Sequence, residues 1–172
     1  MSQLKLSDGR NFEYEDNGVK SDQAILFLHG TPGADKTWSQ WLPQVTDCLA
    51  IAASRAGYGK SDRHKGRTVA DDLADQQALL DHFHIKEFVS IGWSGGGPHS
   101  INMTRDPRSR GAITLAGVGE WGHADLDFLA DMGPENEEEF GEALKGEAAI
   151  QSWMSKNAPS LKSITGPDLI SA

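Results

Sequence analysis

The fold of this 172-residue chain is decided by one stretch, Phe88-Val89-Ser90-Ile91-Gly92-Trp93-Ser94-Gly95-Gly96-Gly97-Pro98-His99. Its first half is apolar, as expected of a buried strand, and it leads directly into the pattern Gly-x-Ser-x-Gly. Gly92 and Gly96, two residues before and two after Ser94, remove the side-chain carbons that would clash across a tight bend. The sequence therefore predicts a strand, a sharp turn with Ser94 at its apex, and the start of a helix.

A serine hydroxyl at such an apex is exposed near the amino end of the next helix. Unpaired amide groups and the helix dipole favour negative charge there, which suits a nucleophile in acyl transfer. Ser94 is therefore the candidate catalytic residue. The alternative is a glycine-rich turn that binds phosphate or nothing, since Gly95-Gly96-Gly97 could cradle an anion. Against phosphate, no Lys-Ser or Lys-Thr pair follows these glycines, and the first strand carries no Gly-x-Gly-x-x-Gly pattern.

The composition narrows the classes of partner and compartment. The formal net charge is -9 and the pI is about 5.0, which argues against nucleic acid or an anionic membrane, because both need basic patches. No apolar run approaches the ~18 residues of a membrane span, and Met1-Ser2-Gln3 does not begin a signal peptide. Cys48 is the only cysteine. We expect a cytoplasmic protein with no cofactor and no metal site.

Strands and helices are expected to alternate through the first two thirds of the chain. An antiparallel hairpin with an Asp8-Gly9 turn comes first, and the pattern Thr68-Val69-Ala70-Asp71 is a capping box that predicts the start of a helix. The remaining expected elements are buried strands at Ala24–Leu28, Cys48–Ala53 and Ala112–Val118 and a short amphipathic helix at Trp38–Leu42.

This alternation predicts an α/β fold, a doubly wound and mostly parallel sheet with an N-terminal antiparallel hairpin. The character of the sequence changes near Glu120. From there, three short helices are expected at residues 125–132, 135–145 and 148–154, separated by glycine and proline.

Three motifs, in this order and spacing, resemble those of the α/β-hydrolase fold superfamily. His29-Gly30-Thr31-Pro32-Gly33 is similar to its oxyanion loop, Arg55–Asp62 to the loop after its fourth strand, and Gly92–Gly96 to its nucleophile elbow. Within the superfamily, the sequence resembles the proline-iminopeptidase and haloperoxidase-like serine hydrolases. Epoxide hydrolases and dehalogenases carry Asp rather than Ser at the position of Ser94.

The resemblance implies a role for each motif residue. Ser94 would be the nucleophile of a serine hydrolase that cleaves an ester, amide or peptide bond of a small substrate through an acyl-enzyme. The oxyanion hole would be formed by the amides of Gly95 and Thr31, with Gly33 as the alternative, because Pro32 has no N–H. The residues expected to support the elbow and the oxyanion loop are His29, Gly30, Gly33, Gly92, Trp93 and Gly96.

The resemblance also implies a domain organisation. Residues 1–119 would form the six-stranded hydrolase core and residues 120–172 the start of a helical cap. In the family, two further strands bring the triad acid and histidine, and we expect this chain to stop before them. Glu120 and His123 are then the only local acid and base near the carboxyl edge of the sheet. The alternative function is a non-catalytic hydrolase-fold binding protein or an inactive fragment.

The incomplete sheet has a consequence for association. The strand at Ala112–Val118 would be an exposed edge, and an unpaired edge invites pairing with another chain. We therefore expect self-association, or completion of the sheet by a complementing chain.

Overall fold

The computed structural model describes residues 2–163. The chain divides into two compact units, Met1–Gly119 and Glu120–Ala172, called here the sheet unit and the helical unit. Each is described by itself.

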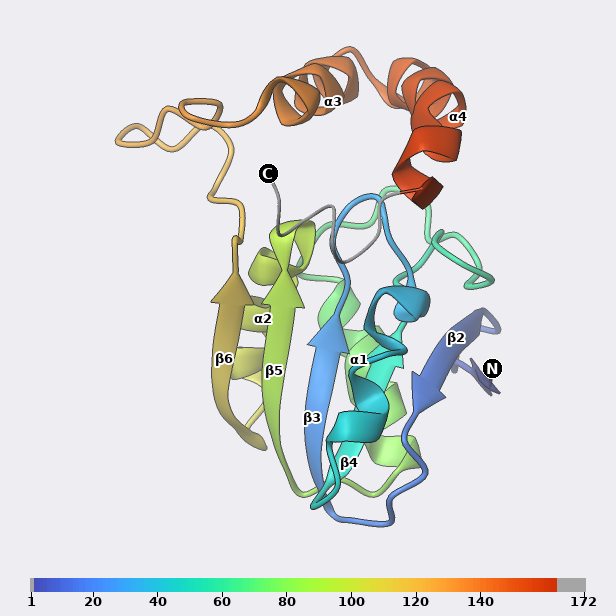
Figure 1. Ribbon diagram of the computed structural model, residues 1–172. Helices are drawn as coiled ribbons and strands as arrows, with labels where there is room; N and C mark the ends of the chain where they lie inside the picture. The colour runs from blue at the N-terminus through green and yellow to red at the C-terminus, as the bar shows by residue number, and fades with distance from the viewer. Residues whose placement is uncertain (1, 164–172) are drawn as a thin grey trace. The chain divides into compact units, whose positions relative to one another are not determined.

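The sheet unit is built on six strands in the order β1-β2-β4-β3-β5-β6 (Figure 1). The strands β1, β2 and β4 pair in antiparallel fashion, whereas β3 pairs in parallel with both β4 and β5, and β5 with β6. This is the mixed, mostly parallel sheet that the sequence predicts, with the antiparallel hairpin at one edge. The strand bounds are Ser2–Lys5 (β1), Asn11–Asp16 (β2), Gln23–Leu28 (β3), Leu49–Ala53 (β4), Glu87–Trp93 (β5) and Ser109–Leu115 (β6).

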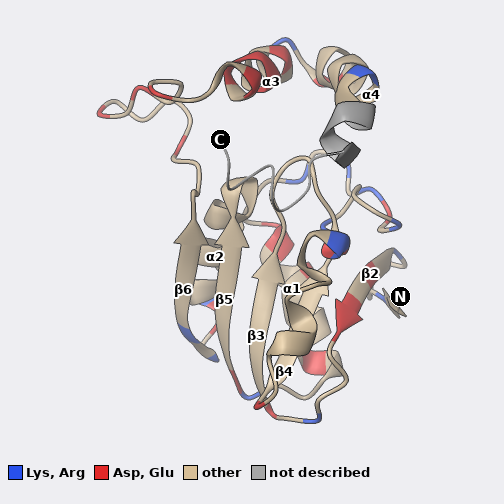
Figure 2. Ribbon diagram, viewed as in Figure 1, with Lys and Arg blue, Asp and Glu red and all other residues tan. Residues whose placement is uncertain are grey.

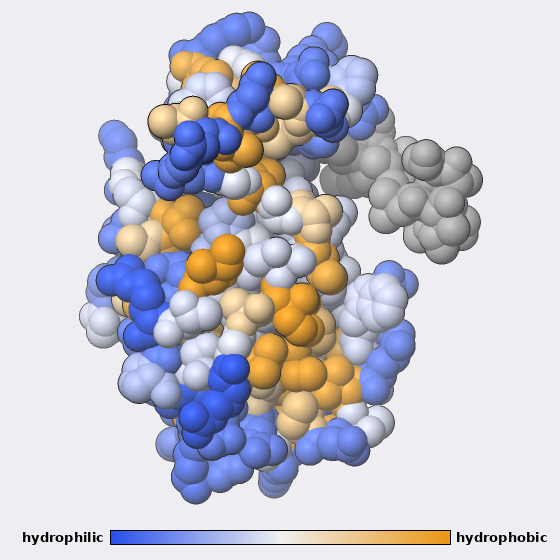
Figure 3. Space-filling view, turned by 90° about the vertical axis from the view of Figure 1, so that its left-hand side faces the viewer, coloured by the Kyte–Doolittle hydropathy of each residue, from blue (hydrophilic) through white to orange (hydrophobic). Residues whose placement is uncertain are grey.

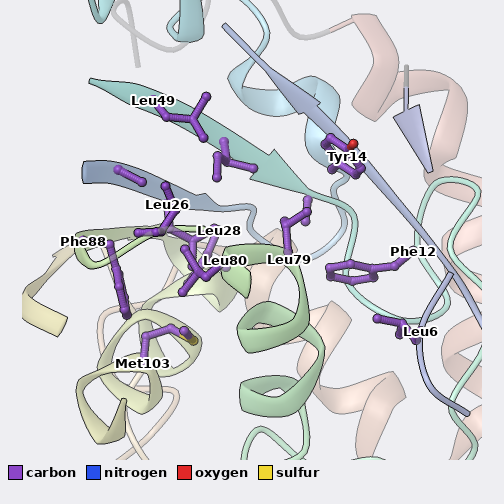
Figure 4. Close-up of a cluster of buried hydrophobic side chains, with 14 residues drawn as sticks. Leu6, Phe12, Tyr14, Leu26, Leu28, Leu49, Leu79, Leu80, Phe88 and Met103 are labelled. Carbon is purple, nitrogen blue, oxygen red and sulfur yellow. The ribbon is translucent and has the colours of Figure 1, made fainter. Parts of the chain in front are cut away.

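One face of the sheet holds the larger core. Alternate residues of β3 and β4 point to this face, where Leu26 and Ile51 are fully buried, and α1 (Asp72–His82) supplies Leu79 and Leu80. Figure 4 shows Leu26, Leu79 and Leu80 in one buried cluster with Phe12 of the hairpin. The helix α2 (Gly97–Asn102) and the 3-10 turn η4 (Met103–Arg105) follow β5 in the chain.

Two 3-10 turns supply the smaller core on the other face. They are η1 (Asp35–Trp38) and η2 (Leu42–Gln44), and they stand where the sequence predicts one amphipathic helix. Trp38 and Leu42 pack against Phe27 of β3 and the alanines of β4. The same face over β5 and β6 keeps apolar residues in partial contact with solvent.

We call this exposed area the β6 face, made of Ile91 and Trp93 on β5 and their register partners Ile113 and Leu115 on β6. Ile113 is 47% exposed and Leu115 45%. Figure 3 shows apolar side chains gathered on the side of the molecule that β6 forms. Among the residues that the structure describes, β6 pairs with β5 alone, so it is an edge strand.

Two boundaries differ from the sequence prediction. The last strand covers Ser109–Leu115 rather than Ala112–Val118, because the next residue, Ala116, has a φ of 47° and turns the chain out of the extended conformation. The first helix begins at Asp72, after the capping box rather than within it, although Asp71 accepts hydrogen bonds from the amide and hydroxyl of Thr68.

The helical unit contains α3 (Pro134–Leu144) and α4 (Glu147–Ser163). The segment 125–132, predicted as a helix, is instead a series of turns, and Asp131 lies in the left-handed region with a φ of 60°. The ring of Phe128 contacts those of Trp121 and Phe140 edge-on, at centroid distances of 5.1 Å and 4.9 Å. Figure 2 shows acidic residues concentrated on α3. No helix within residues 2–163 is both long and apolar enough to cross a bilayer.

Candidate active site

The centre of the candidate site is the turn that follows β5. Ser94 is the first residue of the 3-10 turn η3 (Ser94–Gly96) and has a φ of 51°, in the left-handed region. A serine pays an energetic penalty for this conformation that glycine does not, and such strain is typical of functional turns. The helix α2 begins directly afterwards at Gly97, so the amide of Gly95 lies in a first turn without intrahelical acceptors.

The loop after β3 contacts this turn closely. A β-carbon placed on Gly30 would lie 3.2 Å from the β-carbon of Ser94. One placed on Gly95 would lie 2.7 Å from the Thr31 hydroxyl and 3.3 Å from the Thr31 amide nitrogen. The fold thus brings together Ser94, Gly95, Gly30 and Thr31. Two strands that pair in parallel, β3 and β5, end side by side at this point.

Gly33, Gly96 and Trp93 also lie close to the contact between the loop and the turn. A β-carbon on Gly96 would lie 2.3 Å from the carbonyl oxygen of Leu28, and one on Gly33 would lie 2.8 Å from that of Gly30. Trp93 is half-buried next to Ser94, and its ring would meet a side chain at Gly30. Larger residues at these positions would separate the loop from the turn.

His29 is a buried structural residue of the loop. Its Nε2 accepts a hydrogen bond from the Arg55 amide at 3.0 Å. An amide can only donate, so the ring proton is on Nδ1, which donates to the Gly30 carbonyl at 2.7 Å. Burial, together with the nearby charge of Arg55, lowers the pKa of His29 to about 3. The ring is therefore neutral at physiological pH and is held by its hydrogen bonds rather than by charge.

A buried pair of one histidine and one aspartate joins the helices α1 and α2. It could not be identified from the sequence. Nδ1 of His99, on α2, lies 2.8 Å from a carboxylate oxygen of Asp72 at the start of α1, and both side chains are buried. Burial lowers the pKa of His99. Burial alone would raise the pKa of Asp72, but the hydrogen bond and charge of His99 and the charge of Arg55 hold it below its usual value. The sequence places His99 one turn or more from Ser94 but offers no sign of its partner, which is 27 residues away.

Arg55 is the other residue whose importance the sequence did not reveal. It follows β4 and is 1% exposed, and its guanidinium contacts the loop after β3. The sequence indicated only that it belongs to a loop at the carboxyl edge of the sheet. Arginine is normally exposed, so burial could not be expected from residue type.

The predicted local acid and base, Glu120 and His123, belong to the helical unit. Both are exposed, and the His123 ring accepts a hydrogen bond from the Asp125 amide at 3.2 Å. Their roles stay a prediction. Among the side chains that the structure describes, none forms a hydrogen bond with the Ser94 hydroxyl. In the same part of the chain, His, Cys, Asp and Glu form no group of three or more that could hold a metal ion.

Comparisons with known proteins identify the family of this chain. Residues 23–151 match the family described as alpha/beta hydrolase fold. The sequence is 26% identical over 149 residues to a proline iminopeptidase of Arabidopsis thaliana, covering 80% of this chain and 39% of that protein. It is 31% identical over 97 residues to a non-heme haloperoxidase of Rhodococcus erythropolis, covering 55% of this chain and 35% of that protein.

Solved structures show the same fold. An epoxide hydrolase, CorEH, matches with a TM-score of 0.72 and 18% identity, over 91% of this chain and 56% of that one. An esterase from Exiguobacterium antarcticum matches with a TM-score of 0.56 and 20% identity, over 67% of this chain and 45% of that one. The chain spans between 35% and 40% of the length of the curated relatives it matches. The resemblance inferred from the three motifs is confirmed, and the chain belongs to the α/β-hydrolase fold family.

Proposed function

We propose that this chain carries the nucleophile and the oxyanion hole of a serine hydrolase that cleaves an ester, amide or peptide bond. The observation that carries the proposal is the left-handed conformation of Ser94, at the apex of a turn packed against the loop that contains Thr31. Strain of this kind is maintained where the surrounding structure needs the side chain in one place.

The proposed reaction has two steps. The Ser94 oxygen attacks the carbonyl carbon of the substrate and its proton passes to a general base. The amides of Thr31 and Gly95 donate hydrogen bonds to the oxygen that becomes negative. The leaving group takes a proton and departs as an alcohol or amine, and water then hydrolyses the acyl-enzyme in the same way. The relatives named proline iminopeptidase and haloperoxidase support a small or peptide substrate.

The domain assignment is part of the proposal. Residues 1–119 are assigned to the hydrolase core and residues 120–172 to the start of a helical cap, in a cytoplasmic protein without a cofactor. His123 with Glu120 is the candidate base and acid on this chain.

A second function is favoured by one observation. Ser94 has no hydrogen-bonded base among the described side chains, as expected of a hydrolase-fold protein that binds a ligand without turnover. A serine without a base is a weak nucleophile, so the two functions differ in the reactivity of Ser94.

The test is covalent labelling with a fluorophosphonate probe, with the adduct located by mass spectrometry. Labelling on Ser94 that is lost in Ser94→Ala supports the hydrolase. The matched control is Ser152→Ala, which removes an exposed serine of α4 and should leave labelling unchanged. A protein that is not labelled, or that is labelled equally after Ser94→Ala, refutes the hydrolase. Loss of p-nitrophenyl acetate hydrolysis in His123→Ala would identify the base.

The oxyanion hole is tested by Gly95→Ala, because the new methyl group would meet Thr31. We expect the labelling rate to fall by roughly 10–100-fold, somewhat less than the usual loss of an oxyanion donor. Gly133→Ala, at a position with open space, is the control. Equal rates for the two variants would contradict the Thr31–Gly95 pair.

A further inference from the structure

Arg55 is a buried cation beside the candidate site, and its burial needs a cause. Its side chain is among the largest that are fully buried in the described chain. Transfer of a guanidinium out of water is costly unless hydrogen bonds and a counter-charge compensate for it. Burial accordingly lowers the pKa of Arg55, and the nearby carboxylate of Asp72 opposes that effect.

The hydrogen bonds of its guanidinium converge on three consecutive residues of the oxyanion loop. Nη1 donates to the carbonyl of His29. Nη2 donates to the carbonyl of Gly30 at 3.1 Å and to the hydroxyl of Thr31 at 3.3 Å. The Arg55 amide donates to the His29 ring at 3.0 Å. One side chain thus holds both carbonyls that precede the Thr31 amide.

Fixing these carbonyls fixes the Thr31 amide as well. The peptide group is planar, so the direction of the Gly30 carbonyl determines the direction of the N–H of Thr31 on the opposite side of the same peptide. Thr31 lies outside the helices and strands, and within residues 2–163 its N–H donates no hydrogen bond to a backbone carbonyl. Its nitrogen would lie 3.3 Å from a β-carbon placed on Gly95. The guanidinium therefore sets the orientation of the group that faces the turn.

The Asp72 carboxylate, whose charge acts on Arg55, is also linked through His99 to the helix that follows Ser94. Asp72 begins α1 and His99 lies in α2, and their 2.8 Å hydrogen bond joins the two helices. The amide of Gln76 also approaches Asp72, at 3.5 Å. Among the described residues Asp72 forms no direct ion pair with Arg55, so its charge acts on the guanidinium through the buried interior.

We propose that Arg55 is a positioning residue for the oxyanion hole, which holds the carbonyls of His29 and Gly30 so that the Thr31 amide faces the Ser94 turn. Asp72, fixed by His99, supports it. The catalytic part of this inference depends on the proposed function, whereas the ordering of the loop by Arg55 does not.

The main variant is Arg55→Lys. Lysine retains the charge, but its single ammonium lacks the planar fork that reaches three acceptors at once. The matched control is Arg67→Lys. Arg67 lies over the same Tyr58 ring as Arg55, at 5.9 Å against 5.4 Å, but it donates to the carbonyl of Ala56 and not to the oxyanion loop.

The first readout is the rate of fluorophosphonate labelling at Ser94, resolved into the maximal rate and the concentration for half-maximal rate. We expect Arg55→Lys to lower the maximal rate roughly 10–100-fold, as for a misplaced oxyanion donor. The half-maximal concentration should change little. Arg67→Lys should label like the wild type. Equal maximal rates for Arg55→Lys and the wild type would overturn the proposal.

The second readout is independent of reactivity. The NMR order parameter of the Thr31 amide should fall in Arg55→Lys, while order parameters in β2 and the unfolding midpoint in urea change little. Should the wild type not be labelled at all, the proposed function fails, and this measurement still decides the positioning role. An unchanged order parameter at Thr31 would overturn it.

A second variant covers the case in which Arg55→Lys does not fold. Asp72→Asn has the same shape but no charge, and it should lower both the order parameter at Thr31 and the maximal labelling rate. Wild-type behaviour of a folded Asp72→Asn would refute the supporting role of Asp72. If Arg55→Lys does not fold, order parameters of Asp72→Asn that change only in α1 and α2, and not at Thr31, would overturn the proposal as a whole.

Discussion

A β-carbon placed on Gly92 would lie 2.1 Å from the carbonyl oxygen of Gly96. The end of the strand β5 and the end of η3 therefore approach so closely that no side chain fits between them. This contact forces the chain to reverse direction within four residues, with Ser94 on the outside of the bend.

Gly92→Ala should consequently be strongly destabilising. Either the backbone of the turn shifts or the methyl group overlaps the carbonyl, and overpacking of this kind costs about 1–3 kcal/mol or more. Urea unfolding measures the loss. The control is Gly141→Ala in α3, where nothing lies within 4 Å, and it should be neutral or stabilising by up to about 1 kcal/mol. A Gly92→Ala protein as stable as the wild type would mean that the turn is looser than described.

The protein should lose stability on mild acidification because of His29. Its pKa is about 3 in the folded state against an ordinary value of 6.5, so the unfolded chain binds a proton that the folded chain does not. The free energy of unfolding then falls as the pH drops from about 6.5 toward 3, by about 2 kcal/mol at pH 5 for this group alone.

Urea unfolding at pH 7 and pH 5 measures the effect. His29→Asn should be less stable at pH 7 but should lose less stability on acidification. His84→Asn is the control, because His84 is exposed and has a φ of 57°, which asparagine tolerates. An equal acid loss in the wild type and His29→Asn would contradict the assignment.

The burial of Glu139 in the helical unit predicts the opposite dependence of stability on pH. It is buried, and burial raises its pKa to about 7 from 4.5. The folded state favours the protonated acid, so stability is lost as the pH rises from about 4.5 to 7 and stays low above that. Glu139→Gln should raise the unfolding free energy at pH 8 by on the order of 2 kcal/mol and have little effect at pH 4. Glu138→Gln, at an exposed neighbouring position, is the control. No gain at pH 8 would show that the carboxyl is solvated.

The 172-residue chain should self-associate through the β6 face. An edge strand beside exposed apolar side chains can pair with a second strand and bury those side chains at the same time. Light scattering on the purified chain should show species larger than a monomer. Ile113→Lys should reduce them, whereas Ile101→Lys, at an exposed position of α2, should not. A monomeric wild type would refute this prediction.

The elements that carry strong local patterns could be predicted from the sequence. The apolar runs of β3, β4 and β5 and the glycines around Ser94 identified the sheet, its parallel pairing and the elbow. The loop at His29–Gly33 was identified by its resemblance to the oxyanion loop of the α/β-hydrolase fold superfamily.

Contacts between distant parts of the chain could not be predicted in this way. The bond between Asp72 and His99 and those from Arg55 to Gly30 join residues that are 27 and 25 positions apart. Aspartate and arginine are usually solvated, so nothing local indicates the burial of Asp72 and Arg55. The segment 125–132 was wrongly predicted as a helix because its apolar spacing is also compatible with successive turns.

The fixed tautomer of His29 gives the molecule an internal spectroscopic reporter. The ring proton on Nδ1 is buried and hydrogen-bonded to Gly30, so its exchange with water requires local opening of the structure. A slowly exchanging imidazole resonance should therefore be visible by proton NMR, and its line width would follow the ordering of the oxyanion loop without any substrate or probe.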